Sequence, residues 1–175
     1  MKTLSLRKGE ERRIDAGHLW VFANEVDMAK TPLKSFAPGE QARVEAASGR
    51  PYGLAYVNPN SLICARILDP DARTRFDADF LAGRLKAALE LRQRLFDAPF
   101  YRLCFGEADF LPGLVIDRYG QVLVVQLTTA GMDSRRELIL SVLADLIKPE
   151  AVLLKNDLQV RSLEGLPQTV ETALG

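Results

Sequence analysis

Short apolar segments separated by turn residues occupy the first seventy positions of the chain. Alternating or compact apolar positions predict five strands, and Pro, Gly and Asn fall between them. The expected strands are 3–6, 20–22, 41–46, 52–57 and 62–68. One short helix over 9–17 interrupts them, with Gly17 at the position that commonly follows a helix. This pattern predicts a small, partly open β-barrel.

The remainder of the chain has a different pattern, which begins after the turn at 69–71. Apolar residues at helical spacing predict two helices, and apolar runs predict strands between them. The helices are expected to start at Asp77 or Asp79 and at Asp133 or Ser134, and the strands at 101–105, 114–117, 122–127 and 151–154. The fold class is therefore α+β, with a barrel at 1–73 and a helix packed on a small sheet at 74–175. The tail from Gln159 onward shows no capped or buried element.

The composition is that of an ordinary globular protein, with 47% apolar and 26% charged residues among 175. No apolar run approaches the roughly 18 residues of a membrane span, and the N-terminus does not resemble a secretory signal. We therefore expect a cytoplasmic protein without a membrane partner. Cys64 and Cys104 lie far apart in the sequence, and the chain contains a single His. This set of ligands does not suit a zinc site. Both are predicted to be reduced core residues, and no metal is expected.

Charge is distributed unevenly although the net charge is zero. Residues 1–75 carry 12 Lys/Arg against 9 Asp/Glu, and residues 76–175 carry 11 against 14. A front half with an excess of cations can hold phosphate groups while the whole chain stays neutral.

Three stretches resemble one protein family. LRKGE (6–10) with HLWVF (18–22) resembles the opening of a PUA domain, an RNA-binding fold. GEADFLPGLVIDRYG (106–120), the most specific stretch, and RSLEGL (161–166) complete the resemblance. Together they resemble the large-subunit ribosomal-RNA methyltransferases that modify cytosine at C5, over essentially the whole chain. One departure is Leu19, where members often carry Pro.

The resemblance implies a PUA domain, a central α+β domain and then a Rossmann-like domain that binds S-adenosylmethionine. The first two match, and the third is missing, because no glycine-rich loop follows a strand and the sequence has no GxG. The family's nucleophilic cysteine belongs to the third domain, so neither cysteine here inherits that role. We expect ribosomal RNA as partner, S-adenosylmethionine as cofactor of the full-length parent only, and no activity or bound cofactor in these 175 residues.

The side chains expected to contact RNA are cations and ring systems of the front half: Arg7, Lys8, Arg12, Arg13, His18, Trp20 and Arg66. Cations can meet phosphates, and rings can stack on exposed bases. Structural alternatives remain open. Arg12 and Arg13 could pair with nearby acids at 10, 11 or 15, His18 could satisfy a backbone group, and Trp20 with Phe22 could anchor the core. Arg66 could instead be a partner for Asp69.

Acidic residues of the second half invite a metal or acid–base interpretation, namely Glu107, Asp109 and Asp117. We favour a structural role, with turn capping near 107–109 and pairing of Asp117 with Arg118 or Arg102. No catalytic residue is assigned. The arginines at 84, 92 and 94 are interpreted as a solvated helix face. Two other functions are compatible with the sequence: a stand-alone RNA-binding adaptor, and a protein-interaction module that forms a homodimer.

Overall fold

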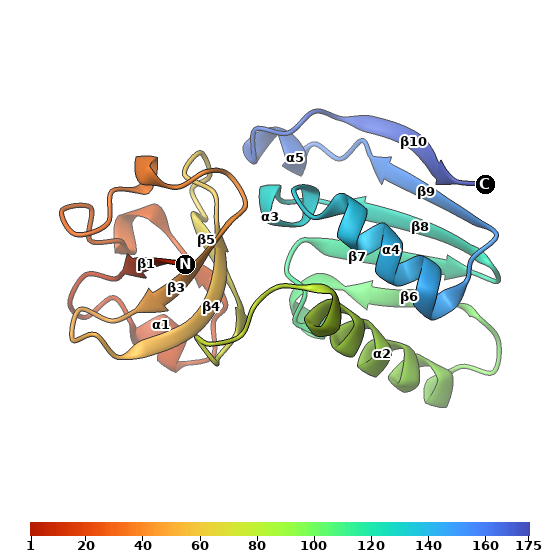
Figure 1. Cartoon of the computed structure of the whole chain (residues 1–175), viewed down its shortest axis with the longest axis horizontal. Coiled ribbons are helices and arrows are strands. Elements are labelled where there is room, and N and C mark those ends of the chain that lie inside the picture. The colour runs from red at the N-terminus through yellow and green to blue at the C-terminus, as the bar shows by residue number, and fades with distance from the viewer. The chain divides into compact units, whose positions relative to one another are not determined.

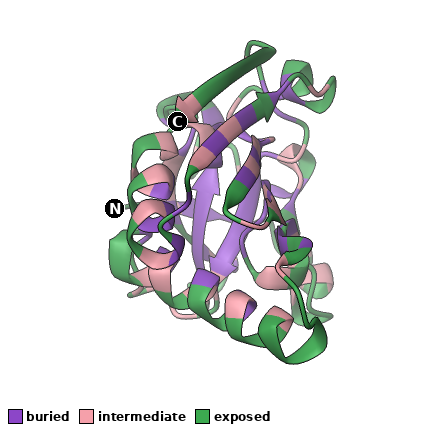
Figure 2. Cartoon of the chain, turned by 90° about the vertical axis from the view of Figure 1, so that its right-hand side faces the viewer, coloured by how far each residue is buried: buried purple, intermediate pink, exposed green.

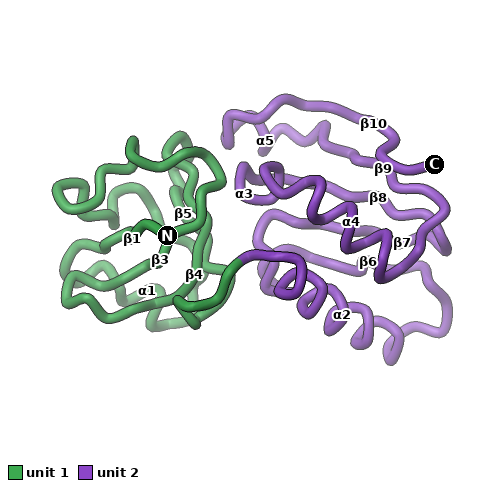
Figure 3. The backbone as a smooth tube through the Cα atoms, viewed as in Figure 1, with its two compact units in different colours: residues 1–75 green, residues 76–175 purple.

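The computed structural model describes all of residues 1–175 (Figure 1). The chain forms two compact units, Met1–Arg75 and Phe76–Gly175 (Figure 3). Each unit is built on a five-stranded sheet that contains both parallel and antiparallel neighbours. The α+β class expected from the sequence is confirmed. None of the helices combines the length and the apolar character that crossing a lipid bilayer requires.

Unit 1 is a curved sheet that forms a half-barrel, as the strand pattern predicts. The strands follow the order β1-β3-β4-β5-β2. Their bounds are β1 (Lys2–Ser5), β2 (Trp20–Val21), β3 (Glu40–Glu45), β4 (Pro51–Val57) and β5 (Ala65–Asp69). Only β1 and β3 run parallel to each other in this sheet, and the other neighbours are antiparallel.

Alternate strand residues of unit 1 fill its core, which is the period-two pattern of a half-buried strand. Val44, Ala55, Val57 and Ile67 all belong to one buried apolar cluster. Three short helices close the ends: α1 (Arg12–Asp15), η1 (Ala23–Glu25) and η2 (Leu33–Ser35). The chain leaves α1 through Gly17, whose φ of +90° confirms the predicted glycine terminator.

Unit 2 is a sheet in the order β10-β9-β8-β7-β6 with two long helices. Its helices are α2 (Ala78–Leu95), η3 (Gly106–Asp109), α3 (Ala130–Asp133), α4 (Arg136–Ile147) and α5 (Val160–Leu163). Its strands are β6 (Phe100–Phe105), β7 (Leu114–Tyr119), β8 (Val122–Leu127), β9 (Ala151–Asn156) and β10 (Thr169–Leu174). The two long helices, α2 and α4, lie side by side on one face of the sheet (Figures 1 and 2).

Helix α2 begins at the residue that the sequence indicates. The Asp77 side chain accepts a hydrogen bond from the Phe80 N–H at 3.0 Å, which satisfies one of the free donors of the first turn. Leu81, Leu85 and Ala88 are buried at i, i+4 and i+7, so one stripe of the helix faces the sheet. Helix α4 also buries one face, at i, i+3, i+4 and i+8, and it starts slightly later than expected because α3 precedes it.

The tail beyond Gln159 is structured, so the expectation that it lacks a buried element is wrong. Arg161 is 2% exposed and donates hydrogen bonds to the Pro167 carbonyl at 2.8 Å, to Asp133 at 2.9 Å and to the Leu127 carbonyl. Strand β10 then pairs antiparallel with β9. A single arginine in the sequence gives no signal that it will be enclosed, because its partners lie up to 34 residues away.

Candidate nucleic-acid interface

A fixed turn after β1 presents the first two candidate cations. The Arg7 N–H donates to the Glu25 carbonyl at 2.8 Å, and the Glu10 N–H donates back to the Arg7 carbonyl at 3.1 Å. Gly9 has a φ of +88°, and its N–H donates to the Glu11 carboxylate at 2.8 Å. These bonds hold the turn in one conformation while the Arg7 and Lys8 side chains remain exposed.

The four cations of the turn and α1 differ in how far they are neutralised. Arg7 meets Glu10 at 3.4 Å, but both side chains are more than one-third exposed, so solvent weakens this pair. Arg13 pairs with Glu25 at 3.2 Å. Lys8 and Arg12 are exposed and form no ion pair. The interpretation in which Arg12 and Arg13 pair with the acids at 10, 11 or 15 is therefore wrong.

Glu25 organises this region, although sequence reasoning did not single it out. Its carboxylate accepts from the Phe22 N–H at 2.8 Å and from Arg13, and the residue is only 5% exposed. The Arg13 guanidinium also lies over the Phe22 ring, 4.6 Å from its centre. Glu25 lies three residues after Phe22, which is the spacing of a capping box, but Phe22 has no side-chain acceptor, so only the half in which Glu25 accepts from the Phe22 N–H is formed.

Trp20 and Arg66 face each other across β2 and β5. They are register partners, and the Arg66 guanidinium lies 5.3 Å from the Trp20 ring centre. Trp20 is 38% exposed and lies outside the buried cluster, whereas Val21 belongs to it, so Trp20 is not a core anchor. His18 is exposed, and its backbone N–H donates to the Arg13 carbonyl at 3.0 Å, which fixes the turn between α1 and β2. That these side chains bind RNA remains a prediction.

A polar cluster ties α1 to the start of β4. The Tyr52 hydroxyl donates to Asp15 at 2.8 Å, and Arg50 bonds to both groups while its guanidinium lies over the Tyr52 ring. The hydrogen bond from Tyr52 and the nearby Arg50 lower the pKa of Asp15, and burial together with the bond to Asp15 raises the pKa of Tyr52. The cluster holds α1 in place, so the backbone that carries the exposed Arg12 side chain is fixed.

The acidic residues of unit 2 have structural partners. Asp109 binds Arg92 through two hydrogen bonds and accepts from the Phe105 N–H, and Asp117 binds Arg102 at 2.8 and 3.0 Å. The structure contains no group of three or more His, Cys, Asp or Glu side chains that could hold a metal ion. The structural interpretation of Asp109 and Asp117 is confirmed. Arg92 is not solvated, because its side chain is only 13% exposed.

Both cysteines lie in the core, as predicted. Cys64 and Cys104 are fully buried, and burial raises the pKa of each thiol to about 12. Each thiol lies 3.5 Å from a backbone carbonyl, of Val21 and Leu114 respectively. Neither thiol is available as a thiolate nucleophile near neutral pH.

Comparison with known proteins places unit 1 in a recognised class. Residues 4–70 match the family described as the PUA-like domain, which confirms the resemblance of the opening motif. The chain as a whole is a homologue of the proteins named ribosomal RNA large subunit methyltransferase I. It is 38% identical over 168 residues to the protein of Shewanella amazonensis and 35% identical over 175 residues to that of Erwinia tasmaniensis.

These matches cover 94% and 98% of this chain but only 41% and 43% of the two relatives. The chain therefore spans well under half the length of the curated relatives it matches. Two solved structures share the fold at 13% identity. A Streptococcus mutans protein described as a SAM-dependent methyltransferase has a TM-score of 0.78, with 100% of this chain and 43% of that chain covered. A methyltransferase structure in complex with SAH has a TM-score of 0.76, with 89% and 40% covered.

Proposed function

We propose that this chain is the RNA-recognition portion of an S-adenosylmethionine-dependent methyltransferase that modifies cytosine C5 of large-subunit ribosomal RNA in the cytoplasm. The PUA-like unit and the names of the relatives support this proposal. The observation that carries it is the state of Lys8 and Arg12. Both are exposed and unpaired on segments fixed by hydrogen bonds, beside the weakly paired Arg7. Such cations are available to meet phosphates without first breaking an internal ion pair.

The chemistry of cytosine methylation explains why recognition and transfer would be separate tasks. C5 of cytosine is a poor nucleophile, and addition of a cysteine thiolate to C6 makes it reactive. The target base must also leave its stack, at a cost of a few kcal/mol. Contacts to the surrounding RNA can offset that cost from a distance. We assign these remote contacts to the cations of unit 1.

Methyl transfer itself would require the part of the relatives' length that this chain does not span. The two thiols here are buried with a pKa of about 12, which does not suit a nucleophilic thiolate. No strand of this chain leads into a glycine-rich loop that would hold the nucleotide part of S-adenosylmethionine. We therefore propose that these 175 residues alone bind RNA and transfer no methyl group.

The test is the salt dependence of binding to a large-subunit rRNA fragment, followed by fluorescence anisotropy. Log affinity should fall with log salt by about 0.7 for each phosphate contacted on single strands. The double substitution Lys8→Ala with Arg12→Ala should weaken binding and reduce that slope by about 1.4. The matched control is Lys30→Ala with Lys34→Ala, which removes the same charge from two exposed lysines of the same unit. Equal effects of the two pairs would reject Lys8 and Arg12 as specific contacts, and absence of binding would reject the function.

A further inference from the structure

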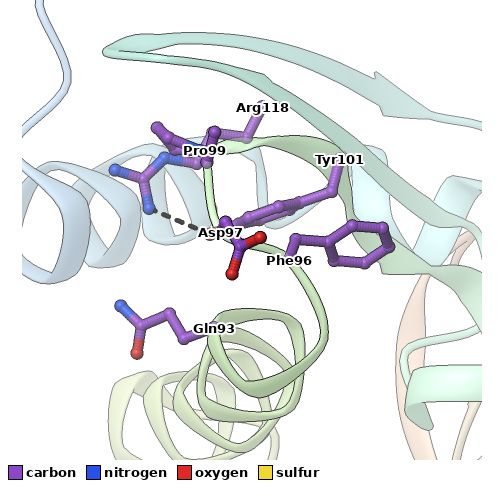
Figure 4. Close-up of a pocket in the computed structure, with 7 residues that line it drawn as sticks. Gln93, Phe96, Asp97, Pro99, Tyr101 and Arg118 are labelled. Carbon is purple, nitrogen blue, oxygen red and sulfur yellow. Dashed lines mark hydrogen bonds between the residues drawn. The ribbon is translucent and has the colours of Figure 1, made fainter.

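A pocket lies in unit 2 where the loop after α2 meets β6. Its volume is about 240 Å³. Figure 4 shows Gln93 coming from α2, Asp97 and Pro99 from the connecting loop, and Arg118 from β7. The Gly120 N–H donates to the Pro99 carbonyl at 2.8 Å, so the loop is fastened to the turn that follows β7. The pocket therefore has defined walls.

Arg118 is a half-buried cation without a carboxylate partner. Its guanidinium donates to the Gly120 carbonyl at 2.9 Å, to the Tyr101 hydroxyl at 3.3 Å and to the Gln121 amide oxygen at 3.2 Å. All three acceptors are neutral. A guanidinium has five N–H donors, so two remain that these three contacts do not use.

Aromatic surface lies beside this cation. The Phe96 and Tyr101 ring centres are 5.5 Å apart, and Tyr101 is the register partner of Arg118. Phe96 is 48% exposed, although large apolar side chains gain free energy by leaving water. Figure 4 shows the Tyr101 ring directed toward Arg118 and Asp97 and the Phe96 ring directed to the opposite side, so a flat ligand beside Arg118 would meet the Tyr101 ring.

A carboxylate and an amide complete the lining. Asp97 is exposed and forms no ion pair, and Gln93 contributes an amide beside it. A simple anion would meet Asp97 as well as Arg118, so inorganic phosphate is a poor match for this set. The lining instead suits a flat group that accepts hydrogen bonds from Arg118 on one edge and donates to Asp97 on the next.

We propose that this pocket binds a guanine base of single-stranded RNA. Guanine carries O6 and N7 as acceptors for the two remaining Arg118 donors. Its N1–H and N2–H₂ groups are donors for the Asp97 carboxylate. Unstacked bases in RNA are commonly held on aromatic side chains and read along these edges. The inference rests on the proposed RNA-recognition function and extends it from phosphate contacts in unit 1 to a base contact in unit 2.

The test uses ¹⁵N-labelled full chain, titrated with each of GMP, AMP, CMP and UMP and followed by ¹H–¹⁵N NMR spectra. All four probes carry the same phosphate, so differences between them report the base. GMP should shift the amide signals of Phe96, Asp97 and Tyr101 and bind about tenfold more tightly than AMP. Asp97→Asn should weaken GMP binding about tenfold and leave AMP binding nearly unchanged. Tyr101→Leu, which removes the ring beside Arg118, should weaken the binding of both purine nucleotides.

The matched control is Asp79→Asn, which makes the same chemical change at an exposed position in the first turn of α2. Equal shifts by all four nucleotides, no shifts near Phe96, or equal effects of Asp97→Asn and Asp79→Asn would each overturn the inference. Failure of the proposed function has a different signature. In that case GMP would still bind at the pocket, while the chain would show no salt-dependent affinity for rRNA.

Discussion

Arg92 and Asp109 form a two-bond ion pair with N–O distances of 2.6 and 2.7 Å, and their side chains are only 13% and 7% exposed. The same arginine donates to the Arg102 carbonyl at 3.1 Å, and the same aspartate accepts from the Phe105 N–H at 2.7 Å. The pair therefore joins the last turns of α2 to β6 and to the turn that follows it.

Asp109→Asn is expected to lower the free energy of unfolding by about 3 kcal/mol, because it leaves the largely buried Arg92 without its counter-charge. The measurement is the urea midpoint followed by far-UV circular dichroism, which reports α2. The control is Asp117→Asn, which breaks another two-bond pair of the same unit, between β7 and β6. Arg102 in that pair is 45% exposed, so a loss below about 1 kcal/mol is expected. Similar losses in both variants would contradict the assigned role of burial.

Gly113 is a position where any added side chain would clash with a neighbouring residue. Its φ is +85°, and an added Cβ would lie 2.2 Å from the hydroxyl oxygen of Thr129. The Thr129 side chain caps α3. Gly120 has a φ of +64° but open space around it. Gly113→Ala should therefore destabilise the chain by about 3 kcal/mol, from backbone strain plus overpacking, and Gly120→Ala by about 1 kcal/mol. Thermal unfolding of both variants would show whether the clash or the backbone angle dominates.

The sequence predicts local features of this molecule well and distant contacts poorly. Asp77 as the cap of α2 and Gly17 after α1 follow from neighbours within four residues. Partners far apart in sequence leave no comparable signal. Arg13 meets Glu25 across 12 residues, and Arg92 meets Asp109 across 17. These cations are indistinguishable from solvated ones until the chain is folded.

The candidate interface shows the same division. Its residue types could be identified, because exposed cations and aromatic rings are the groups that contact RNA. Which of them remain available could not be predicted. The stacking of Arg66 on Trp20 depends on the register of β2 and β5, and the freedom of Lys8 and Arg12 depends on where the acids of unit 1 find partners.

Burial of the two thiols predicts a pH dependence. The pKa of Cys64 and of Cys104 is raised to about 12, above the ordinary value of 9.0. A group whose pKa is raised on folding contributes stability that is fully present below its unfolded pKa and is lost as pH rises through the folded value. The unfolding midpoint should therefore decrease as the pH is raised from about 9 to about 12. The decrease should be smaller when both cysteines are replaced by Ala. At pH 8 the native chain should consume no equivalents of a thiol reagent, and the denatured chain should consume two.

Trp20 provides an internal reporter for the RNA proposal, since it is the only tryptophan in the chain. It is 38% exposed and lies against Arg66, so a base stacked on it would quench its emission. Addition of an rRNA fragment should lower tryptophan fluorescence over the same concentration range in which anisotropy reports binding.

Trp20→Ala should weaken binding by about 1–3 kcal/mol, the usual contribution of one base–aromatic stack. Leu62→Ala, which truncates a 72% exposed apolar side chain of the same unit, should leave the affinity unchanged. Binding without quenching, or equal losses in the two variants, would remove Trp20 from the interface and leave the contacts to the cations alone.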